Sequence, residues 1–160
     1  MDDLFFEAKL KDAIHRLGIE AEHRHFDQSC HSVAEAAAAV GAPSEGFVKN
    51  VGFADAAGNL VICIVKGEDQ VDKDAAARIV GSDKLKRATP ELMLEKTGYP
   101  VGGTPSFGYA GSVTVLIDER VMERPLVWTG GGSPQALVRI APSELLKANG
   151  GKVCRIRKLV

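Results

Sequence analysis

Two apolar runs joined by a short turn constrain the fold of this chain more than any other feature. Residues 46–53 and 60–66 are rich in β-branched and aromatic side chains, and the sequence Ala-Ala-Gly-Asn lies between them. This pattern predicts a β-hairpin. Other strand candidates are interspersed with helix candidates, without the regular strand–helix–strand period of a parallel sheet. We therefore expect an α+β fold with a mixed or antiparallel sheet.

Helical periodicity, cap residues and stop glycines define the expected helices. The first covers residues 3–17, where apolar side chains recur at helical spacing before Gly18. Ser32, with Glu35 three residues later, forms a capping-box pattern ahead of the second. The other expected helices are 73–80, 90–97 and a short one from 142, and the other expected strands are 21–26, 84–88, 113–117, 126–129, 136–140 and 153–156.

Length and composition indicate one globular domain. The chain has 160 residues, which suits a single domain over residues 1–160, since domains mostly run ~100–200 residues. Hydrophobic residues make up 45% and charged residues 26%, and these values exclude a disordered chain. The formal net charge of −1 excludes a protein that coats nucleic acid through bulk positive charge.

Neither the cysteines nor the histidines form a pattern typical of a disulfide framework or a metal site. Cys30, Cys63 and Cys154 are odd in number and widely spaced, which favours free thiols and a reducing, cytoplasmic location. All four histidines lie in the first 31 residues and no HEXXH motif is present, so we expect no metal. The N-terminus has two acids at once and no apolar run, so we do not expect a signal peptide. The longest aliphatic run, residues 60–65, is far shorter than the ~20 residues that span a bilayer, so we expect no membrane partner.

Lys49 is the first candidate for chemistry. Side chains of a strand alternate between its faces, so Lys49 is expected to share a face with Phe47, Val51 and Phe53. One interpretation is an edge lysine whose stem is buried while its ammonium reaches water. The other is a fixed cation for a phosphate, a carboxylate or a developing oxyanion. Asn50, on the opposite face, is expected to face helices or solvent and to add nothing specific.

Glycine is concentrated in two short segments. Of the 17 glycines, eight fall between Gly98 and Gly132. Residues 102–108 read Gly-Gly-Thr-Pro-Ser-Phe-Gly, and residues 128–134 read Trp-Thr-Gly-Gly-Gly-Ser-Pro. Each segment is either a tight turn or a loop that presents backbone N–H groups to an anion or a carbonyl oxygen. The first segment lacks the GK[ST] of a P-loop and follows a helix, which excludes a dinucleotide fingerprint.

Two basic clusters are further candidates. Lys84, Lys86 and Arg87 form one cluster, and four basic residues between positions 152 and 158 form the other. Each cluster is either a solvated face or a local patch that contacts phosphate.

Four motifs follow one another in order over about residues 25–145. They are Ser-Cys-His-Ser-Val-Ala-Glu-Ala-Ala at 29–37, Phe-Val-Lys-Asn-Val-Gly-Phe at 47–53, Thr-Gly-Tyr-Pro-Val-Gly-Gly-Thr-Pro-Ser-Phe-Gly at 97–108 and Val-Trp-Thr-Gly-Gly-Gly-Ser-Pro at 127–134. In this order and spacing, the chain resembles the YbaK/prolyl-tRNA-synthetase-associated family of editing domains. The resemblance implies an α+β fold with a curved mixed or antiparallel sheet flanked by helices.

The resemblance also implies an activity. It points to a free-standing aminoacyl-tRNA deacylase that hydrolyses the ester of mischarged tRNA in trans, in translation quality control, without metal or cofactor. The implied substrate is tRNA-Pro carrying a small amino acid such as Ala, Cys or Ser. The partner would be the acceptor end of this tRNA, with an aminoacyl-tRNA synthetase as a candidate second partner and no DNA. The oligomeric state stays open.

The family's functional positions carry over by matching motifs. Lys49 matches the functional lysine and is the candidate catalytic residue. The candidate substrate-binding residues are Gly102, Gly103, Thr104, Pro105 and Gly108 in the first loop and Gly130, Gly131 and Ser133 in the second.

Three residues depart from the family pattern. Asn50 stands where Ser or Thr is frequent, Gly52 where a larger apolar residue is common, and Tyr109 where His is often seen. These departures bear on the choice of substrate.

A mechanism without a strong nucleophile suits this substrate. An aminoacyl ester is already activated, so its hydrolysis needs positioning and oxyanion stabilisation above all. The hypothesis is that Lys49 holds the terminal phosphate or ribose while the backbone of residues 102–108 contacts the aminoacyl group. A water, assisted by a ribose hydroxyl or by the substrate's own side chain, attacks the carbonyl. Two other classes stay open: a non-catalytic binder of the acceptor end or a nucleotide-like ligand, and a protein-interaction scaffold.

Overall fold

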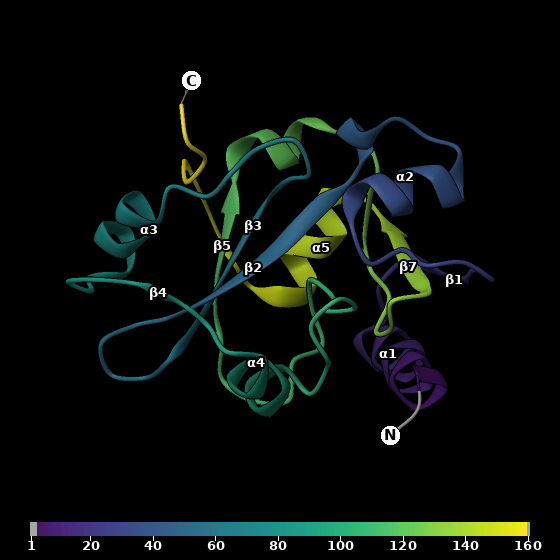
Figure 1. The fold of residues 1–160 in the computed structure, drawn as a ribbon, viewed down its shortest axis with the longest axis horizontal. Coiled ribbons are helices and arrows are strands. Elements are labelled where there is room, and N and C mark those ends of the chain that lie inside the picture. The colour runs from purple at the N-terminus through teal and green to yellow at the C-terminus, as the bar shows by residue number, and fades with distance from the viewer. Residues whose placement is uncertain (1–2, 160) are drawn as a thin grey trace.

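The computed structural model describes residues 3–159, which form helices and strands in irregular alternation (Figure 1). The α-helices of this part of the chain are α1 (Asp3–Leu17), α2 (Val33–Val40), α3 (Lys73–Val80), α4 (Pro90–Thr97) and α5 (Pro142–Asn149), and the 3₁₀ helices are η1 (Ser44–Gly46) and η2 (Glu119–Glu123). The strands are β1 (Ala21–His25), β2 (Val48–Ala54), β3 (Leu60–Lys66), β4 (Lys86–Arg87), β5 (Thr114–Asp118), β6 (Val127–Gly130), β7 (Ala136–Ile140) and β8 (Lys152–Cys154).

The strands form two sheets, so the expected α+β fold with mixed and antiparallel pairing is confirmed. The larger sheet has the order β4-β2-β3-β5-β8, with antiparallel pairs on the β2 side and parallel pairs on the β5 side. The smaller sheet is antiparallel, with the order β1-β7-β6. A single parallel bridge between Phe47 and Trp128 connects the two. In Figure 1, α1, β1 and β7 lie together on one side of the molecule, and α3 lies on the opposite side.

The predicted hairpin is the pair β2–β3, in register from Val48 opposite Lys66 to Ala54 opposite Leu60. Its turn is closed by the side chain of Asp55, which accepts hydrogen bonds from the backbone N–H groups of Ala57 and Asn59 at 3.0 and 2.8 Å. Gly58 takes φ +85° in this turn, a conformation that residues with a Cβ rarely adopt. Local chemistry therefore fixes the register of the strand that carries Lys49.

The predicted helix caps are confirmed. Ser32 accepts a hydrogen bond from the backbone N–H of Glu35 at 3.1 Å, and its hydroxyl donates to the Glu35 carboxylate at 3.3 Å. Asp72 caps α3 and Thr89 caps α4 in the same manner. Such caps satisfy backbone donors that the first turn of a helix leaves free.

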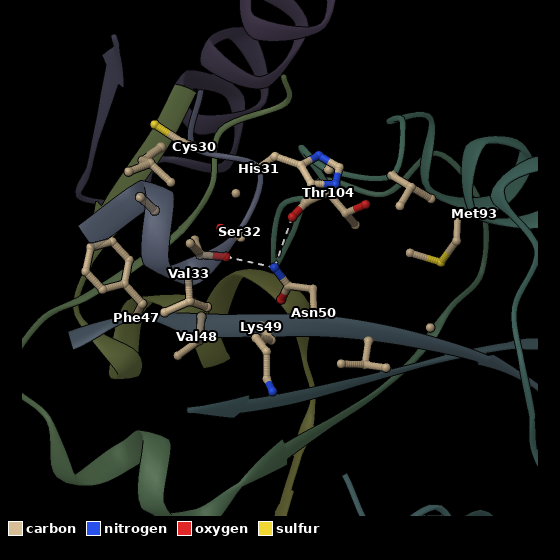
Figure 2. Close-up of a pocket in the computed structure, with 18 of the residues that line it drawn as sticks. Cys30, His31, Ser32, Val33, Phe47, Val48, Lys49, Asn50, Met93 and Thr104 are labelled. Atoms are coloured by element: carbon tan, nitrogen blue, oxygen red, sulfur yellow. Dashed lines mark hydrogen bonds between the residues drawn. The ribbon is translucent and has the colours of Figure 1, made fainter. Parts of the chain in front are cut away.

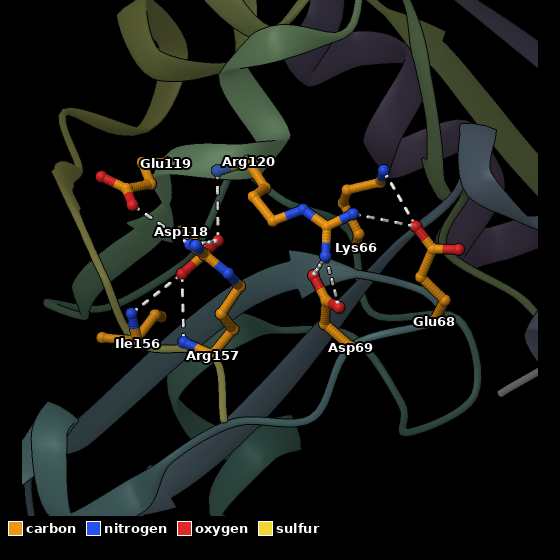
Figure 3. A network of polar contacts seen from close by, with 8 residues as sticks. All are labelled: Lys66, Glu68, Asp69, Asp118, Glu119, Arg120, Ile156 and Arg157. Carbon is orange, nitrogen blue, oxygen red and sulfur yellow. Dashed lines mark hydrogen bonds and ion pairs between the residues drawn. The ribbon is translucent and has the colours of Figure 1, made fainter. Parts of the chain in front are cut away.

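The last strand ends earlier than predicted, and Asp118 explains the difference. We expected residues 153–156, whereas β8 covers Lys152–Cys154. The fully buried carboxylate of Asp118 accepts the backbone N–H groups of Ile156 and Arg157 at 2.9 and 3.0 Å (Figure 3). These donors are therefore taken out of the strand ladder. The predicted strand over 84–88 is likewise shorter, because only Lys86 and Arg87 pair with β2.

The larger sheet separates two apolar clusters, which explains why β3 is buried along its whole length. Leu60, Ile62 and Ile64 belong to the cluster beneath α1, α4 and α5, which also contains Tyr99 and Phe107. The alternate residues of β3 face the second cluster, formed with α3 and Ile156. A third, smaller cluster joins α2 to Phe47, Trp128 and Leu137. The longest described helix, α1, has 15 residues, and no helix in residues 3–159 has the length and apolar character to cross a membrane.

Candidate functional site

A pocket of about 530 Å³ lies at the free edge of β2. One edge of β2 pairs with β3 from end to end. The other edge bonds to β4 only at Phe53 and Ala54, and is bridged to Trp128 at Phe47. Within residues 3–159, no strand covers the edge between these two points, and the pocket opens there.

Four segments that lie far apart in the sequence build the walls of this pocket. They are the residues before and in α2, the first glycine-rich loop, the strand β6, and the N-terminal half of α4 with the residues before it. Figure 2 shows His31 and Thr104 facing the edge of β2 from one side and Met93 closing the pocket at the α4 end. The motifs of the sequence thus converge on one cavity.

The two glycine-rich loops meet, a point that the sequence left undecided. The backbone N–H of Gly132 donates to the carbonyl of Gly103 at 2.8 Å. A Cβ on Gly103 would lie 2.6 Å from the Cα of Ser133, and one on Gly130 would overlap the carbonyl of Thr104. The absence of side chains therefore lets the two backbones touch, which is the structural use of these glycines.

Asn50 holds this junction against β2. Its amide donates to the carbonyl of Thr104 at 3.0 Å and to the hydroxyl of Thr129 at 2.9 Å (Figure 2). Its carbonyl oxygen accepts from the buried hydroxyl of Ser106 at 2.6 Å, and Ser106 and Thr129 share a further hydrogen bond of 2.7 Å. The expectation that Asn50 faces helices or solvent and adds nothing specific is therefore wrong. The face of β2 that carries Asn50 is the one that meets both glycine loops.

Lys49 lines the same pocket from the other face of β2. Its ammonium points away from His31 and Thr104, on the side of the strand opposite Asn50 (Figure 2). The pocket reaches both faces because it wraps around the free edge of the strand. Burial lowers the pKa of Lys49, an effect that the carboxylate of Asp69 opposes and the guanidinium of Arg87 reinforces.

The other predicted residues divide into pocket walls and supports. Gly102, Thr104 and Gly130 line the pocket. Ser133 is buried behind it, where its hydroxyl donates to the carboxylate of Glu7 at 2.7 Å and anchors the second loop on α1. The remaining predicted positions, which do not line the pocket, are Gly103, Pro105, Gly108 and Gly131.

His31 is a pocket residue that sequence reasoning did not assign to the site. Its imidazole lies against Gly102, in the space that a Cβ on that glycine would occupy. Gly102 has φ +96°, so glycine is favoured there for its backbone conformation as well as for the room it leaves. The one sequence signal was the position of His31 directly before the Ser32 cap.

Three comparisons relate this chain to known proteins. The sequence matches the family model described as the aminoacyl-tRNA editing domain over residues 27–148. The chain belongs to this family of editing domains. The match includes β2, both glycine-rich loops and every wall of the pocket.

The relatives of this editing domain include both separate proteins and parts of larger enzymes. It is 25% identical over 134 residues to the uncharacterised protein YwhH of Bacillus subtilis, covering 84% of this chain and 85% of that protein. It is 33% identical over 88 residues to the proline–tRNA ligase of Nitratidesulfovibrio vulgaris, covering 55% of this chain but only 15% of the ligase.

A solved structure has the same fold over nearly the whole chain. It belongs to a protein provisionally assigned as a trans-editing enzyme for prolyl-tRNA synthetase, with a TM-score of 0.88 and 32% sequence identity. The alignment covers 96% of this editing domain and 97% of that protein.

The described part of the editing domain contains no metal-binding cluster. Among residues 3–159, no group of three or more His, Cys, Asp and Glu side chains could hold a metal ion.

Proposed function

We propose that this editing domain, as one unit over residues 1–160, hydrolyses the ester of mischarged aminoacyl-tRNA in trans. The observation that carries the proposal is the pocket at the free edge of β2, where both glycine loops meet in a chain of the editing family. Its volume of about 530 Å³ lies within the ~300–1,000 Å³ usual for small-ligand sites, so it can take a terminal aminoacyl-adenosine.

The reaction needs little from the protein beyond positioning. Water adds to the ester carbonyl, the tetrahedral intermediate expels the ribose oxygen, and that oxygen takes up a proton as the free carboxylic acid is released. Groups that are fixed before the reaction stabilise the developing oxyanion most effectively. The hydrogen bonds from Asn50 to Thr104 and Thr129 support such a role for the first loop, because they fix its backbone on the strand.

Lys49 supplies the positive charge. Its half-buried ammonium lies at the pocket and binds the phosphate or ribose end of the substrate, while the glycine loops face the aminoacyl group. A lysine at the edge of a pocket acts as a compact point charge, which suits a phosphate oxygen.

The proposed substrate is tRNA-Pro that carries a small amino acid such as Ala, Cys or Ser. The sulfur of Met93 fills the space that a side chain at position 52 would occupy, so Gly52 does not enlarge the cavity. Both loops also approach closely, which keeps the cavity narrow on the Asn50 side. A steric limit of this kind separates substrates that differ by one methylene by only ~1–3 kcal/mol.

A deacylation panel tests the proposal. Wild-type protein is mixed with tRNA-Pro charged with Ala, Cys, Ser, Thr or Pro, and loss of each ester is followed. We expect rapid loss of at least one small non-cognate ester and retention of Pro. Binding of the charged tRNAs without any hydrolysis would instead identify the protein as a binder of the acceptor end.

Lys49→Ala tests the assigned cation in the same assay. Loss of the charge is expected to lower kcat/KM roughly 100-fold, the usual scale for one electrostatic group. The melting temperature should change little, because the ammonium of Lys49 has no ion-pair partner among the described residues. Unchanged deacylation by this variant would remove Lys49 from the mechanism.

A further inference from the structure

Arg87 lies on the same face of the sheet as Lys49. In the antiparallel pair β2–β4, Arg87 is directly opposite Phe53. Directly opposed residues of neighbouring strands project from the same face, and residues two and four positions along a strand share that face. Phe53, Val51 and Lys49 therefore lie on one face with Arg87 at its β4 end.

Both cations also line the pocket, and both are left without a counter-ion. Lys49 and Arg87 are among the lining residues, with Val51 between them. Within residues 3–159, no carboxylate lies within ion-pair distance of either side chain.

Asp69 is the carboxylate whose charge acts on Lys49, and it already forms an ion pair with another residue. Both of its oxygens accept hydrogen bonds from the guanidinium of Arg120, at 2.9 and 3.1 Å (Figure 3). The same network pairs Lys66 with Glu68 at 2.9 Å. Lys66 and Arg120 are therefore each paired with a carboxylate, whereas Lys49 and Arg87 have no ion-pair partner among residues 3–159.

The electrostatic coupling of the two side chains agrees with this geometry. Burial is the largest cause of the lowered pKa of Lys49; the carboxylate of Asp69 raises this pKa, and the positive charge of Arg87 lowers it. Two cations that repel one another at a cavity are stabilised when an anion binds between them.

We propose that Lys49 and Arg87 together form a phosphodiester subsite for the 3′ strand of an RNA. The proposal rests on the proposed function and adds the path that the RNA strand takes across β2. The terminal aminoacyl-adenosine lies on the Asn50 side of β2, the chain crosses the free edge of the strand, and the preceding phosphates run along the Lys49 face toward β4. Arg87 is then a binding residue that contacts the phosphates of the RNA and takes no part in the chemistry at the ester.

Lys86 provides a matched control for Arg87. It is the neighbouring residue of the same strand, it is also exposed, and it pairs with Ala54. Its side chain projects from the opposite face of β4, and it does not line the pocket. Removal of Lys86 changes the net charge by the same amount as removal of Arg87 without changing the proposed subsite.

The kinetic experiment compares substrates with and without phosphates. Arg87→Ala, Arg87→Lys and Lys86→Ala are assayed on an aminoacyl-adenosine nucleoside and on the same amino acid esterified to a CCA trinucleotide. Arg87→Ala should raise KM for the trinucleotide roughly tenfold, the scale of one charge-assisted hydrogen bond, with kcat and the nucleoside kinetics unchanged. Arg87→Lys should recover part of the loss, and Lys86→Ala should behave as wild type.

A binding experiment makes the subsite testable apart from hydrolysis. Anisotropy of a labelled, uncharged CCA trinucleotide is measured between low and high salt. Arg87→Ala should reduce the slope of log K against log salt by about 0.7, the value for one phosphate contact on a single strand.

Each result separates the two proposals. Equal losses with the nucleoside and the trinucleotide, or equal effects of Lys86→Ala and Arg87→Ala, would overturn the subsite. Absence of turnover by wild-type protein, together with an Arg87-dependent salt slope, would overturn the proposed hydrolysis and leave the subsite standing. Turnover by wild-type protein, together with a salt slope that Arg87→Ala leaves unchanged, would overturn the subsite and leave the proposed hydrolysis standing.

Discussion

The two faces of β2 present the pocket with opposite kinds of surface. On the Asn50 face, the carboxamide and the hydroxyls of Ser106 and Thr129 are joined in one hydrogen-bonded network against both glycine loops. On the Lys49 face, Lys49 and Arg87 have no ion-pair partners within the described residues. The first face is therefore held by hydrogen bonds within the protein, whereas the proposed subsite would bring an anion to the charges of the second face.

The comparison predicts that changes on the Asn50 face reduce both stability and activity, whereas changes on the Lys49 face reduce binding and activity alone. The effects described above for Lys49→Ala and Arg87→Ala belong to the second class. The predictions for Gly130 and Asn50 test the first class, and a third prediction concerns His23, which bonds to the second loop.

Gly130→Ala should have the largest effect. A Cβ at this position would overlap the backbone carbonyl of Thr104, so the two loops must separate. Overpacking against backbone is expected to lower the free energy of unfolding by about 3 kcal/mol. Separation of the loops by ~1 Å should also reduce deacylation roughly 100-fold.

Urea denaturation and the deacylation assay measure both effects of Gly130→Ala. Gly46→Ala is the control, since its new Cβ would meet only the side chain of Arg124 at 3.6 Å. Equal stability of the two variants would contradict the close approach of the loops.

Asn50→Ala should have an intermediate effect. It removes the donor to Thr104 and the acceptor of Ser106, and it leaves the buried groups of both loops with fewer partners. We expect a loss of about 2 kcal/mol in the free energy of unfolding. Deacylation should fall through kcat more than through KM, because the loop is displaced while the cations remain.

Asn50→Ser is the informative partner of Asn50→Ala. Serine retains one hydroxyl that can reach the network, so part of the stability and of kcat should return. A loss confined to KM in either variant would show that Asn50 acts by ligand binding and not by fixing the loop.

The smallest effect concerns His23, whose ring bonds to the carbonyl of Gly131 in the second loop at 2.8 Å. Burial lowers the pKa of His23 below its usual value of 6.5, against opposing contributions from that hydrogen bond and from Glu7. The unfolded chain therefore binds more protons than the folded one just below pH 6.5, and stability must fall as the pH decreases through this range.

His23→Gln should flatten this dependence, since glutamine retains a hydrogen-bonding group but does not titrate. Melting temperatures from pH 7.5 to 5 measure the slope. His15→Gln, on the exposed side of α1, is the control, and the same flattening in both variants would exclude a specific contribution from His23.

Much of the fold was predictable because its signals are local. Caps such as Ser32 and Thr89, stop glycines such as Gly98 and the Asp55–Asn59 turn act within a few residues, and the predicted elements follow them closely. The end of β8 was not predictable, because the group that removes Ile156 from the strand is a carboxylate 38 residues away.

The candidate site was predictable in part. The motifs identified Lys49 and the two loops, since unusual residue types at fixed spacing are visible in a sequence. The contacts of Asn50 were missed. The alternation of side chains along a strand assigns each residue to a face, but it does not tell which face the rest of the molecule will cover. The sequence named Arg87 as part of a basic cluster, either a solvated face or a phosphate-contacting patch, and His31 only within a motif. Their places on the pocket come from packing.

The sequence by itself determined the helices, the hairpin, the family and the residue types available for chemistry. Each of these depends on interactions between residues close in the chain, or on motifs that can be compared directly. Only the tertiary structure decided that the two glycine loops touch, that Asn50 bonds to both, and that the pocket wraps around the free edge of β2. These features depend on contacts between segments that lie from 29 residues (Gly103 and Gly132) to 79 residues (Asn50 and Thr129) apart along the chain, so no local pattern encodes them.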